Sequence, residues 1–169
     1  MDDLERLAER SHHLLSTARF MTLATCDGTS PWASTVNFVA LHAPLRLLYY
    51  SLRTARHSLN IEHHPRVAGS MFLTGLPGFG LDGAQFTGLC RPIETNTLTE
   101  HHQLYYTLNF PDENDRRQWL LPPPEFRDEG PRRFYTLEVT QWWLLDIDRW
   151  LVDKHDQRVA VPLQALTGR

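Results

Sequence analysis

A short polar segment between two regular elements is the part of this chain that could bind a charged small molecule. Its residues are Arg53-Thr54-Ala55-Arg56-His57, and they separate a strand-like run, 45–50, from a helix-like run, 58–64. The first backbone N–H groups of a helix have no partners inside the helix, and with the helix dipole they attract anions. Arg56 and His57 would add cationic donors there and Thr54 a hydroxyl, which predicts a phosphate site. A solvated basic turn that binds nothing explains the same residues equally well.

The elements around this segment follow from the spacing of apolar residues. Leucines and alanines recur at helical intervals over residues 3–17. Strands are expected at 20–26, 32–41, 45–50, 67–74, 84–90 and 134–147, with 158–163 as a last edge strand. A helical insertion near 97–120 precedes three consecutive prolines at 122–124, and we expect a mobile surface loop from there to residue 131. Antiparallel strands joined by short turns, such as Asp27-Gly28, predict a mainly β barrel or sandwich with flanking helices.

The composition argues against several classes of protein. The 169 residues, 41% hydrophobic and 22% charged, predict one globular domain with its own core. A net charge of -3 gives no support for nucleic-acid binding, and no apolar run approaches the length of a membrane span. The first residues, MDDLERLAER, are acidic and amphipathic, unlike a signal peptide. We therefore expect a cytoplasmic protein in which Cys26 and Cys90 are reduced.

Adjacent histidines occur at 12–13, 63–64 and 101–102, and they raise the question of a metal site. Neighbouring residues on a helix point in different directions, so such a pair rarely binds one ion. A structural zinc site needs about four convergent ligands, and neither HExxH nor CxxC spacing is present. We expect no bound metal.

The order of these features resembles the pyridoxamine 5'-phosphate oxidase-like superfamily of FMN-binding split barrels. That family has a strand, a short basic turn, and a helix that ends near Asn-Pro-Arg-Val; residues 63–67 here read His-His-Pro-Arg-Val. Arg56 falls on a basic phosphate position, whereas His57 stands where the family commonly has Lys and Ala55 where it often has Ser or Thr. The run 83–88, GAQFTG, looks like the family strand in which a Gln reaches the flavin. The resemblance covers residues 20–146 and is closer to small bacterial members than to the biosynthetic oxidase.

The resemblance implies a six-stranded antiparallel split β-barrel that forms a homodimer with two FMN sites at the interface, each built from both chains. A barrel of this size fills its interior with side chains, so a cofactor outside the barrel is physically reasonable. The second strand would pass beside the flavin ring, and the next strand with the basic turn would hold the ribityl chain and phosphate. Trp142 and Trp143 alternate across a strand, so one can face the core and the other the partner or the flavin, with packing as the alternative for both. The cofactor-binding residues implied in this way are Ser34, Thr35, Val36, Asn37, Tyr50, Ser51, Thr54, Arg56, His57, Gln85 and Trp142.

The function that the resemblance implies is FMN-dependent oxidation and reduction, in which the cofactor passes hydride or electrons between a reductant and a small-molecule substrate. The sequence identifies no catalytic side chain. A non-catalytic flavin-binding or flavin-sensing module is the alternative, followed by a structural dimer without a cofactor. Pyridoxamine phosphate oxidation itself is disfavoured, because the Arg-x-His motif of that enzyme has no counterpart in the tail, which reads KHDQR at 154–158. The choice between FMN and a deazaflavin stays open.

Overall fold

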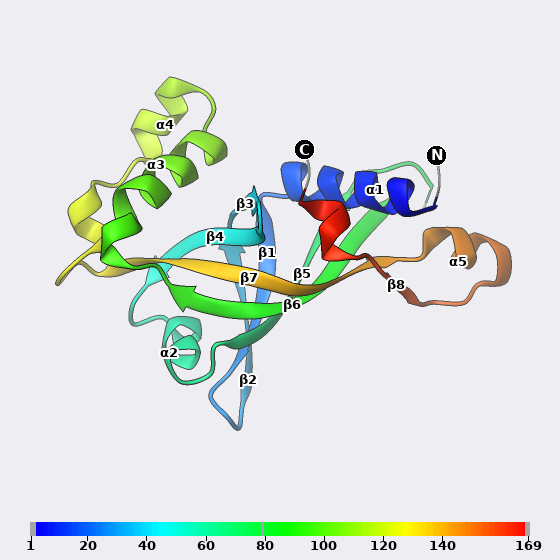
Figure 1. Cartoon of the computed structure of the whole chain (residues 1–169), viewed down its shortest axis with the longest axis horizontal. Coiled ribbons are helices and arrows are strands. Elements are labelled where there is room, and N and C mark those ends of the chain that lie inside the picture. Colours follow the sequence, from blue (N-terminus) through cyan, green and yellow to red (C-terminus); the bar gives the residue numbers. More distant parts are fainter. Residues whose placement is uncertain (1–2, 79, 168–169) are drawn as a thin grey trace.

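One curved antiparallel sheet, with helices packed at its ends, forms most of the molecule (Figure 1). The computed structural model describes residues 3–78 and 80–167. The strands are β1 (Phe20–Cys26), β2 (Pro31–Asn37), β3 (Val39–His42), β4 (Leu45–Leu52), β5 (Arg66–Thr74), β6 (Leu81–Pro92), β7 (Arg132–Leu145) and β8 (Arg158–Ala160). The helices are α1 (Asp3–Thr17), α2 (Arg56–His63), α3 (Leu98–Asn109), α4 (Glu113–Trp119) and α5 (Ile147–Asp153), with 3-10 turns η1 (Thr95–Thr97), η2 (Pro123–Phe126) and η3 (Leu163–Leu166).

The two edge strands of this sheet are neighbours in the sequence, and this forces the sheet to close. The strand order is β2-β1-β5-β6-β7-β4-β3, with β8 beside β7. β2 and β3 lie at opposite ends of that order, yet Phe38 alone separates them in the chain. The sheet must therefore curl until its two edges approach each other. This confirms the prediction of a mainly β split barrel with flanking helices.

The strand count differs from the six expected for the barrel, because the sheet has eight strands in the described part of the chain. The run predicted as one strand over 32–41 is divided into β2 and β3 at Phe38. At Phe38 the chain leaves the ladder between β1 and β2. The carbonyl oxygen of Arg19 accepts hydrogen bonds there from Phe38 N at 3.1 Å and from Asn37 Nδ2 at 2.8 Å. β8 is the last edge strand expected over 158–163, and it ends at Ala160, because Pro162 begins the turn into η3.

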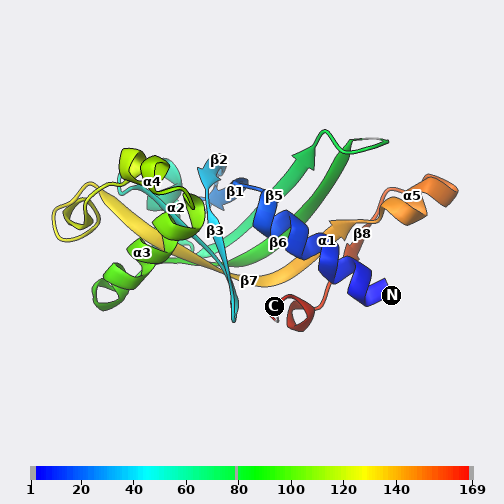
Figure 2. The same ribbon diagram turned by 90° about the horizontal axis from the view of Figure 1, so that it is seen from above.

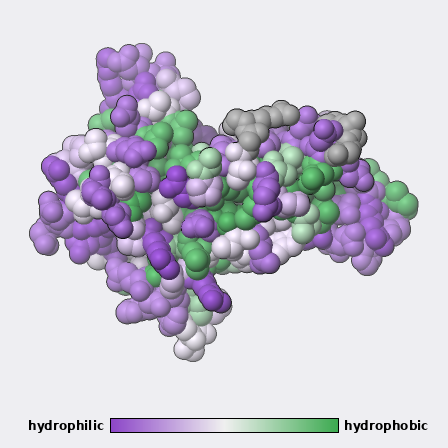
Figure 3. Space-filling view, viewed as in Figure 1, coloured by the Kyte–Doolittle hydropathy of each residue, from purple (hydrophilic) through white to green (hydrophobic). Residues whose placement is uncertain are grey.

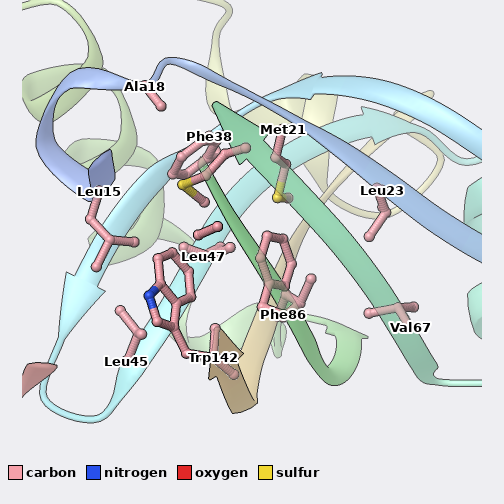
Figure 4. Packing of buried hydrophobic residues seen from close by; sticks show 14 of the residues in the cluster. Leu15, Ala18, Met21, Leu23, Phe38, Leu45, Leu47, Val67, Phe86 and Trp142 are labelled. Carbon is pink, nitrogen blue, oxygen red and sulfur yellow. The ribbon is translucent and has the colours of Figure 1, made fainter. Parts of the chain in front are cut away.

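The inner face of the sheet carries the main hydrophobic core (Figure 4). Side chains alternate along each strand, so every second residue points inward. Figure 4 shows Phe86 and Trp142 pointing into this core from β6 and β7, and their rings stack with centroids 5.8 Å apart. On β4 the inward residues Leu45, Leu47 and Tyr49 are no more than 2% exposed.

Helix α1 covers one part of this core because its apolar residues fall on one side. Leu14 and Leu15 are buried, and the helix contacts β3, β5, β6 and η3. Figure 2 shows α1 running alongside the sheet. The buried Ser11 on the same side accepts a hydrogen bond from Trp142 Nε1 at 3.0 Å, which satisfies the indole N–H inside the core.

A second apolar cluster lies on the outer side of β3, β4 and β7, beneath α3 and η2. Phe126 of η2 is 2% exposed and stacks on Phe134 with ring centroids 4.5 Å apart. The expectation of a mobile surface loop over residues 122–131 is therefore wrong, since Phe126 pins this segment to the sheet. The sequence did not reveal this because one apolar residue in a proline-rich, charged run shows no periodicity.

The connection between β7 and β8 contains a helix that the sequence pattern does not predict. The side chain of Asp146 accepts from the backbone N of Arg149 at 3.1 Å and so begins α5. This helix exposes Leu151 and Val152, by 65% and 86%, and Figure 3 shows apolar surface at the α5 end of the molecule. None of the helices in the described part of the chain is long and apolar enough to cross a membrane.

Gly69 of β5 is the place where the core packs closest to the backbone of the sheet. A Cβ atom at this position would lie 2.4 Å from Phe86 Cζ and 2.7 Å from the Thr22 carbonyl oxygen. The substitution Gly69→Ala should therefore lower the free energy of unfolding by about 1–3 kcal/mol, the usual cost of overpacking. Urea denaturation measures this. Ser70→Ala on the other face of β5 is the control and should stay within about 0.5 kcal/mol of the wild type; equal stability of both variants would contradict this close packing.

Candidate functional site

The outer face of β1, β2, β5, β6 and the end of β7 presents polar and small side chains in transverse rows. Residues directly opposed in an antiparallel ladder point to the same side of a sheet. The register places Ala33, Ala24, Ala68, Thr87 and Gln141 in one such row. A parallel row consists of Thr35, Thr22, Ser70, Gln85 and Trp143. We call this surface the outer face.

Two shallow grooves run over the outer face. The first, of about 490 Å³, is lined by residues of both rows, Gln85 and Trp143 among them, and by Arg158 of β8. The second, of about 630 Å³, adjoins it and extends to Cys26, Arg66 and Gln141. Among the described residues no side chain bonds the amide of Gln85, so its donor and its acceptor can both serve a ligand.

A β-bulge lies where the two grooves meet. The pairing of β6 with β7 shifts between Thr87 and Gly88, which leaves Thr140 as the extra residue on β7. The hydroxyls of Thr87 and Thr140 are 3.1 Å apart, and Thr87 Oγ1 also donates to Gln141 Oε1 at 3.1 Å. Bulges of this kind change the direction of side chains and recur beside binding sites.

The bulge also decides which of the two adjacent tryptophans faces outward. Trp142 was expected at the cofactor, but it is 1% exposed, opposite Phe86 in the core. Trp143 lies opposite Gln85 and lines the first groove. The sequence alone cannot choose between them, because the alternation of a strand fits either phase until its register is known.

His57 lies inside the barrel end that α2 covers, between two hydroxyl groups. Its Nδ1 atom is 3.0 Å from Ser34 Oγ and its Nε2 atom is 2.8 Å from Ser51 Oγ. In a neutral imidazole one ring nitrogen donates and the other accepts, which matches two hydroxyl partners. The ring is 8% exposed, and burial lowers its pKa from the ordinary value of 6.5. His57 therefore ties β2 and β4 to α2 in its neutral form.

Arg56 begins α2 on the solvent side and contacts the β1–β2 hairpin. Its guanidinium carbon lies 4.6 Å from the centre of the Trp32 ring, in a cation–π contact. Its Nη2 atom is 3.7 Å from Asp27 Oδ2, and the two side chains are 44% and 45% exposed. Thr54 is exposed in the turn before it.

Three further residues expected near the flavin serve packing in this chain. Val36 is 7% exposed in the main core. The Asn37 amide oxygen accepts from Tyr105 Oη at 2.6 Å and from Asn109 Nδ2, which fastens β2 to α3. Tyr50 packs edge-on against the rings of the second cluster, Tyr105 among them.

The expected site residues thus form two groups on opposite faces of the β1–β2 hairpin. Ser34, which bonds His57, pairs with Leu23 of the core, so the basic turn lies on the inner side of β2. Thr35 and Gln85 lie on the outer face, separated by β1 and β5. Neighbouring strands are about 4.8 Å apart, so Gln85 is roughly 14 Å from β2. One small ligand cannot contact Gln85 and the basic turn of the same chain.

The residues present fit the ring of a flavin better than they fit its phosphate. The ring has a polar edge that needs donors and acceptors, and the Gln85 amide with the free backbone edge of β2 supplies both. The basic turn exposes two guanidinium groups: Arg56 already lies beside a carboxylate, and Arg53 donates to the Asp128 carbonyl oxygen at 3.4 Å. The imidazole of His57 is bonded to serines inside the barrel end. In the described part of the chain, no group of three His, Cys, Asp or Glu side chains could hold a metal ion.

Sequence reasoning missed Thr22, Ser70 and Asp27 as members of these groups. Thr22 and Ser70 join the row of Gln85 through strand register alone, for which a single sequence carries no signal. Asp27 was interpreted as a hairpin residue, which it is, and its carboxylate also reaches Arg56 across sequence-distant elements.

Comparisons with known proteins identify several that are similar to this chain. A family model described as pyridoxamine 5'-phosphate oxidase matches residues 7–146. UPF0306 protein PM1958 of Pasteurella multocida is 29% identical over 86 residues, which are 51% of this chain and 58% of that relative. A heme binding protein of Mycobacterium smegmatis superposes with a TM-score of 0.67 at 16% identity, covering 95% of this chain and 59% of the other. A FAD-binding protein of Mesorhizobium loti does so with a TM-score of 0.61 at 15% identity, covering 84% and 92%.

The buried His57 predicts a stability that falls in mild acid. Its pKa is about 6.5 in the unfolded chain and lower in the folded one, so its contribution is complete above pH 6.5 and is lost as the pH falls toward the folded pKa. The free energy of unfolding should therefore drop between pH 7.5 and 5.5 by more in the wild type than in His57→Gln. Urea titrations at the two pH values measure this. The exposed His63 of the same helix gives the control His63→Gln, which should keep the wild-type drop; a His57→Gln variant with that same drop would contradict the prediction.

Proposed function

This chain belongs to the pyridoxamine 5'-phosphate oxidase-like split-barrel family, and on that premise we propose that it is a flavin-dependent oxidoreductase that works as a homodimer. The family match confirms the resemblance seen in the sequence. The observation that carries the proposal is the division of the candidate residues into two groups on opposite faces of the β1–β2 hairpin.

A second copy of the chain resolves this division. Each copy would supply the β2 edge with the basic turn to one site and the outer face with Gln85 to the other. The outer face suits such an interface, since its rows consist of small and uncharged residues and it also exposes Phe20 and Phe72 by 58% and 59%. Exposed apolar surface of this kind is typical of association, and self-complementary pairing of one face gives a closed dimer.

The flavin, when bound, would accept and pass on the hydride or electrons of the reaction. The chain's own residues would bind and orient it. Gln85 would bond the polar edge of the ring and Trp143 would border the groove, while Arg56 would lie at the phosphate end. FMN is the form that the sequence predicts. The FAD-binding relative in fold supports a flavin in general, and the heme binding relative makes heme the competing ligand to exclude.

Mass spectrometry of the ligand released on denaturation, with an absorption spectrum of the intact protein, tests the proposal. A flavin spectrum with the mass of a flavin would support it. A Soret band of heme, or failure of riboflavin, FMN and FAD to bind the purified protein, would overturn it. Steady oxidation of NADH or NADPH with turnover would then separate an oxidoreductase from a non-catalytic flavin-binding module.

The dimer leads to a prediction for Ala68, in the middle of the outer face. Wild-type protein should sediment at micromolar concentration with twice the chain mass of 19.6 kDa. Ala68→Arg would place a long charged side chain in the interface and should give the single-chain mass. Thr99→Arg, an equal change at an exposed position of α3, should leave the dimer intact. A wild type that sediments as one chain would rule out a site built from two copies.

The amide of Gln85 should contribute to flavin affinity. Loss of a neutral hydrogen bond is worth about 1 kcal/mol, so Gln85→Ala should weaken riboflavin binding about fivefold and shift the flavin absorption spectrum. Fluorescence quenching and spectra during titration measure both, with Gln103→Ala on the exposed side of α3 as the control. If the variant kept the wild-type affinity and spectrum, Gln85 would be a surface residue and not a ligand.

A further inference from the structure

One of the two exposed cations of the basic turn, Arg56, lies beside a carboxylate from another part of the chain. Arg56 Nη2 lies 3.7 Å from Asp27 Oδ2, and the Trp32 ring supports the guanidinium from one face. Carboxylates and phosphates both interact with a guanidinium group through their anionic oxygens, so a carboxylate this close to Arg56 competes with an incoming phosphate for its charge.

The backbone of the hairpin holds Asp27 in this place. Its other oxygen, Oδ1, accepts from the backbone N atoms of Ser30 at 2.7 Å and Thr29 at 2.9 Å. Gly28 has a φ of +98°, a conformation that favours glycine and lets the hairpin turn this tightly. The bonds from Ser30 and Thr29, and then the charge of Arg56, lower the pKa of Asp27. The carboxylate is therefore ionised and fixed in direction at neutral pH.

The neighbouring imidazole does not restore the positive charge. His57 is neutral and has both ring nitrogens within hydrogen-bond distance of Ser34 and Ser51. Arg56 and Asp27 carry opposite unit charges that sum to zero, and the other cation of the turn, Arg53, donates to the Asp128 carbonyl oxygen at 3.4 Å. A phosphomonoester carries a charge of about -1.5 to -2 at pH 7, so it gains little electrostatic attraction beside the Arg56–Asp27 pair.

We infer, resting on the proposed flavin site, that Asp27 determines which flavin this chain accepts: it disfavours a terminal phosphate, as in FMN, and leaves binding to the ring. The ligand class is then a flavin without a phosphate, as in riboflavin. The ring contacts come from the outer face and the β2 edge, which are independent of the charge at the turn.

Asp27→Asn is the variant that isolates this effect. Asparagine keeps an oxygen at Oδ1 for the bonds from Ser30 and Thr29, so the hairpin keeps its shape while the charge is lost. Asp115→Asn on the exposed side of α4 changes the net charge by the same amount and is the control. Apoprotein of each variant is titrated with riboflavin, FMN and FAD, and dissociation constants are measured by flavin fluorescence.

The expected result has two parts, and the inference requires both. Wild-type protein should bind FMN less than about tenfold more tightly than riboflavin, and Asp27→Asn should raise that preference about three- to tenfold, as expected for one nearby charge in a solvated place. Asp115→Asn should leave the preference within twofold of the wild type.

A wild-type preference for FMN of tenfold or more, or an unchanged preference in Asp27→Asn, would overturn the inference. The wild-type comparison stands even if Asp27→Asn does not fold. Failure of all three flavins to bind the wild type would instead reject the proposed flavin site.

Discussion

The rest of this structure depends on the single residue that joins the two edges of the sheet. β2 and β3 lie at opposite ends of the strand order, and Phe38 connects them directly, so the sheet cannot lie flat. Closure gives the sheet an inner face, which must be packed with side chains, and an outer face, which can stay exposed. The bonds to the Arg19 carbonyl oxygen and the burial of Phe38, which is 2% exposed, hold the connection in place.

A curled sheet of this kind has open ends, and polar contacts help to close them here. Arg10 of α1 donates from Nη2 to Asp82 at 2.7 Å and to the Leu145 carbonyl oxygen at 2.9 Å, where α1 meets β6 and β7. At the α2 end, Asn60 Nδ2 donates to Thr25 Oγ1 at 3.0 Å, and His57 lies between its two serines. Buried polar groups are costly unless they are bonded, and these are bonded. These hydrogen bonds fix the position of each helix on its end of the barrel, because a shift of the helix would leave a buried polar group without its partner.

The same closure accounts for the arrangement of the candidate site. Inward residues of β2 meet α2 and the basic turn, and outward residues continue the flat rows across β1, β5 and β6. α3 and η2 cover the outer side of β3 and β4, so the part of the sheet that stays open is the part that carries Gln85 and the grooves. The proposal of a ligand shared between two copies rests on this open face and on the basic turn at the other side of the β1–β2 hairpin.

The sequence by itself determined most of the elements and the family, because both follow from local patterns. Apolar spacing gave α1 and the barrel strands, the Asp27-Gly28 turn gave the first hairpin, and the run around Arg56 with GAQFTG gave the resemblance that the family match confirmed. The tertiary structure decided everything that depends on register and on contacts between distant segments. It placed Trp142 inside and Trp143 outside, because the bulge at Thr140 of the same strand sets the phase, and it buried Phe126 in a segment that resembled a loop. It also turned His57 inward and put Asp27 beside Arg56, because the orientation of a side chain is set by the groups that surround it in space and not by its neighbours in the chain.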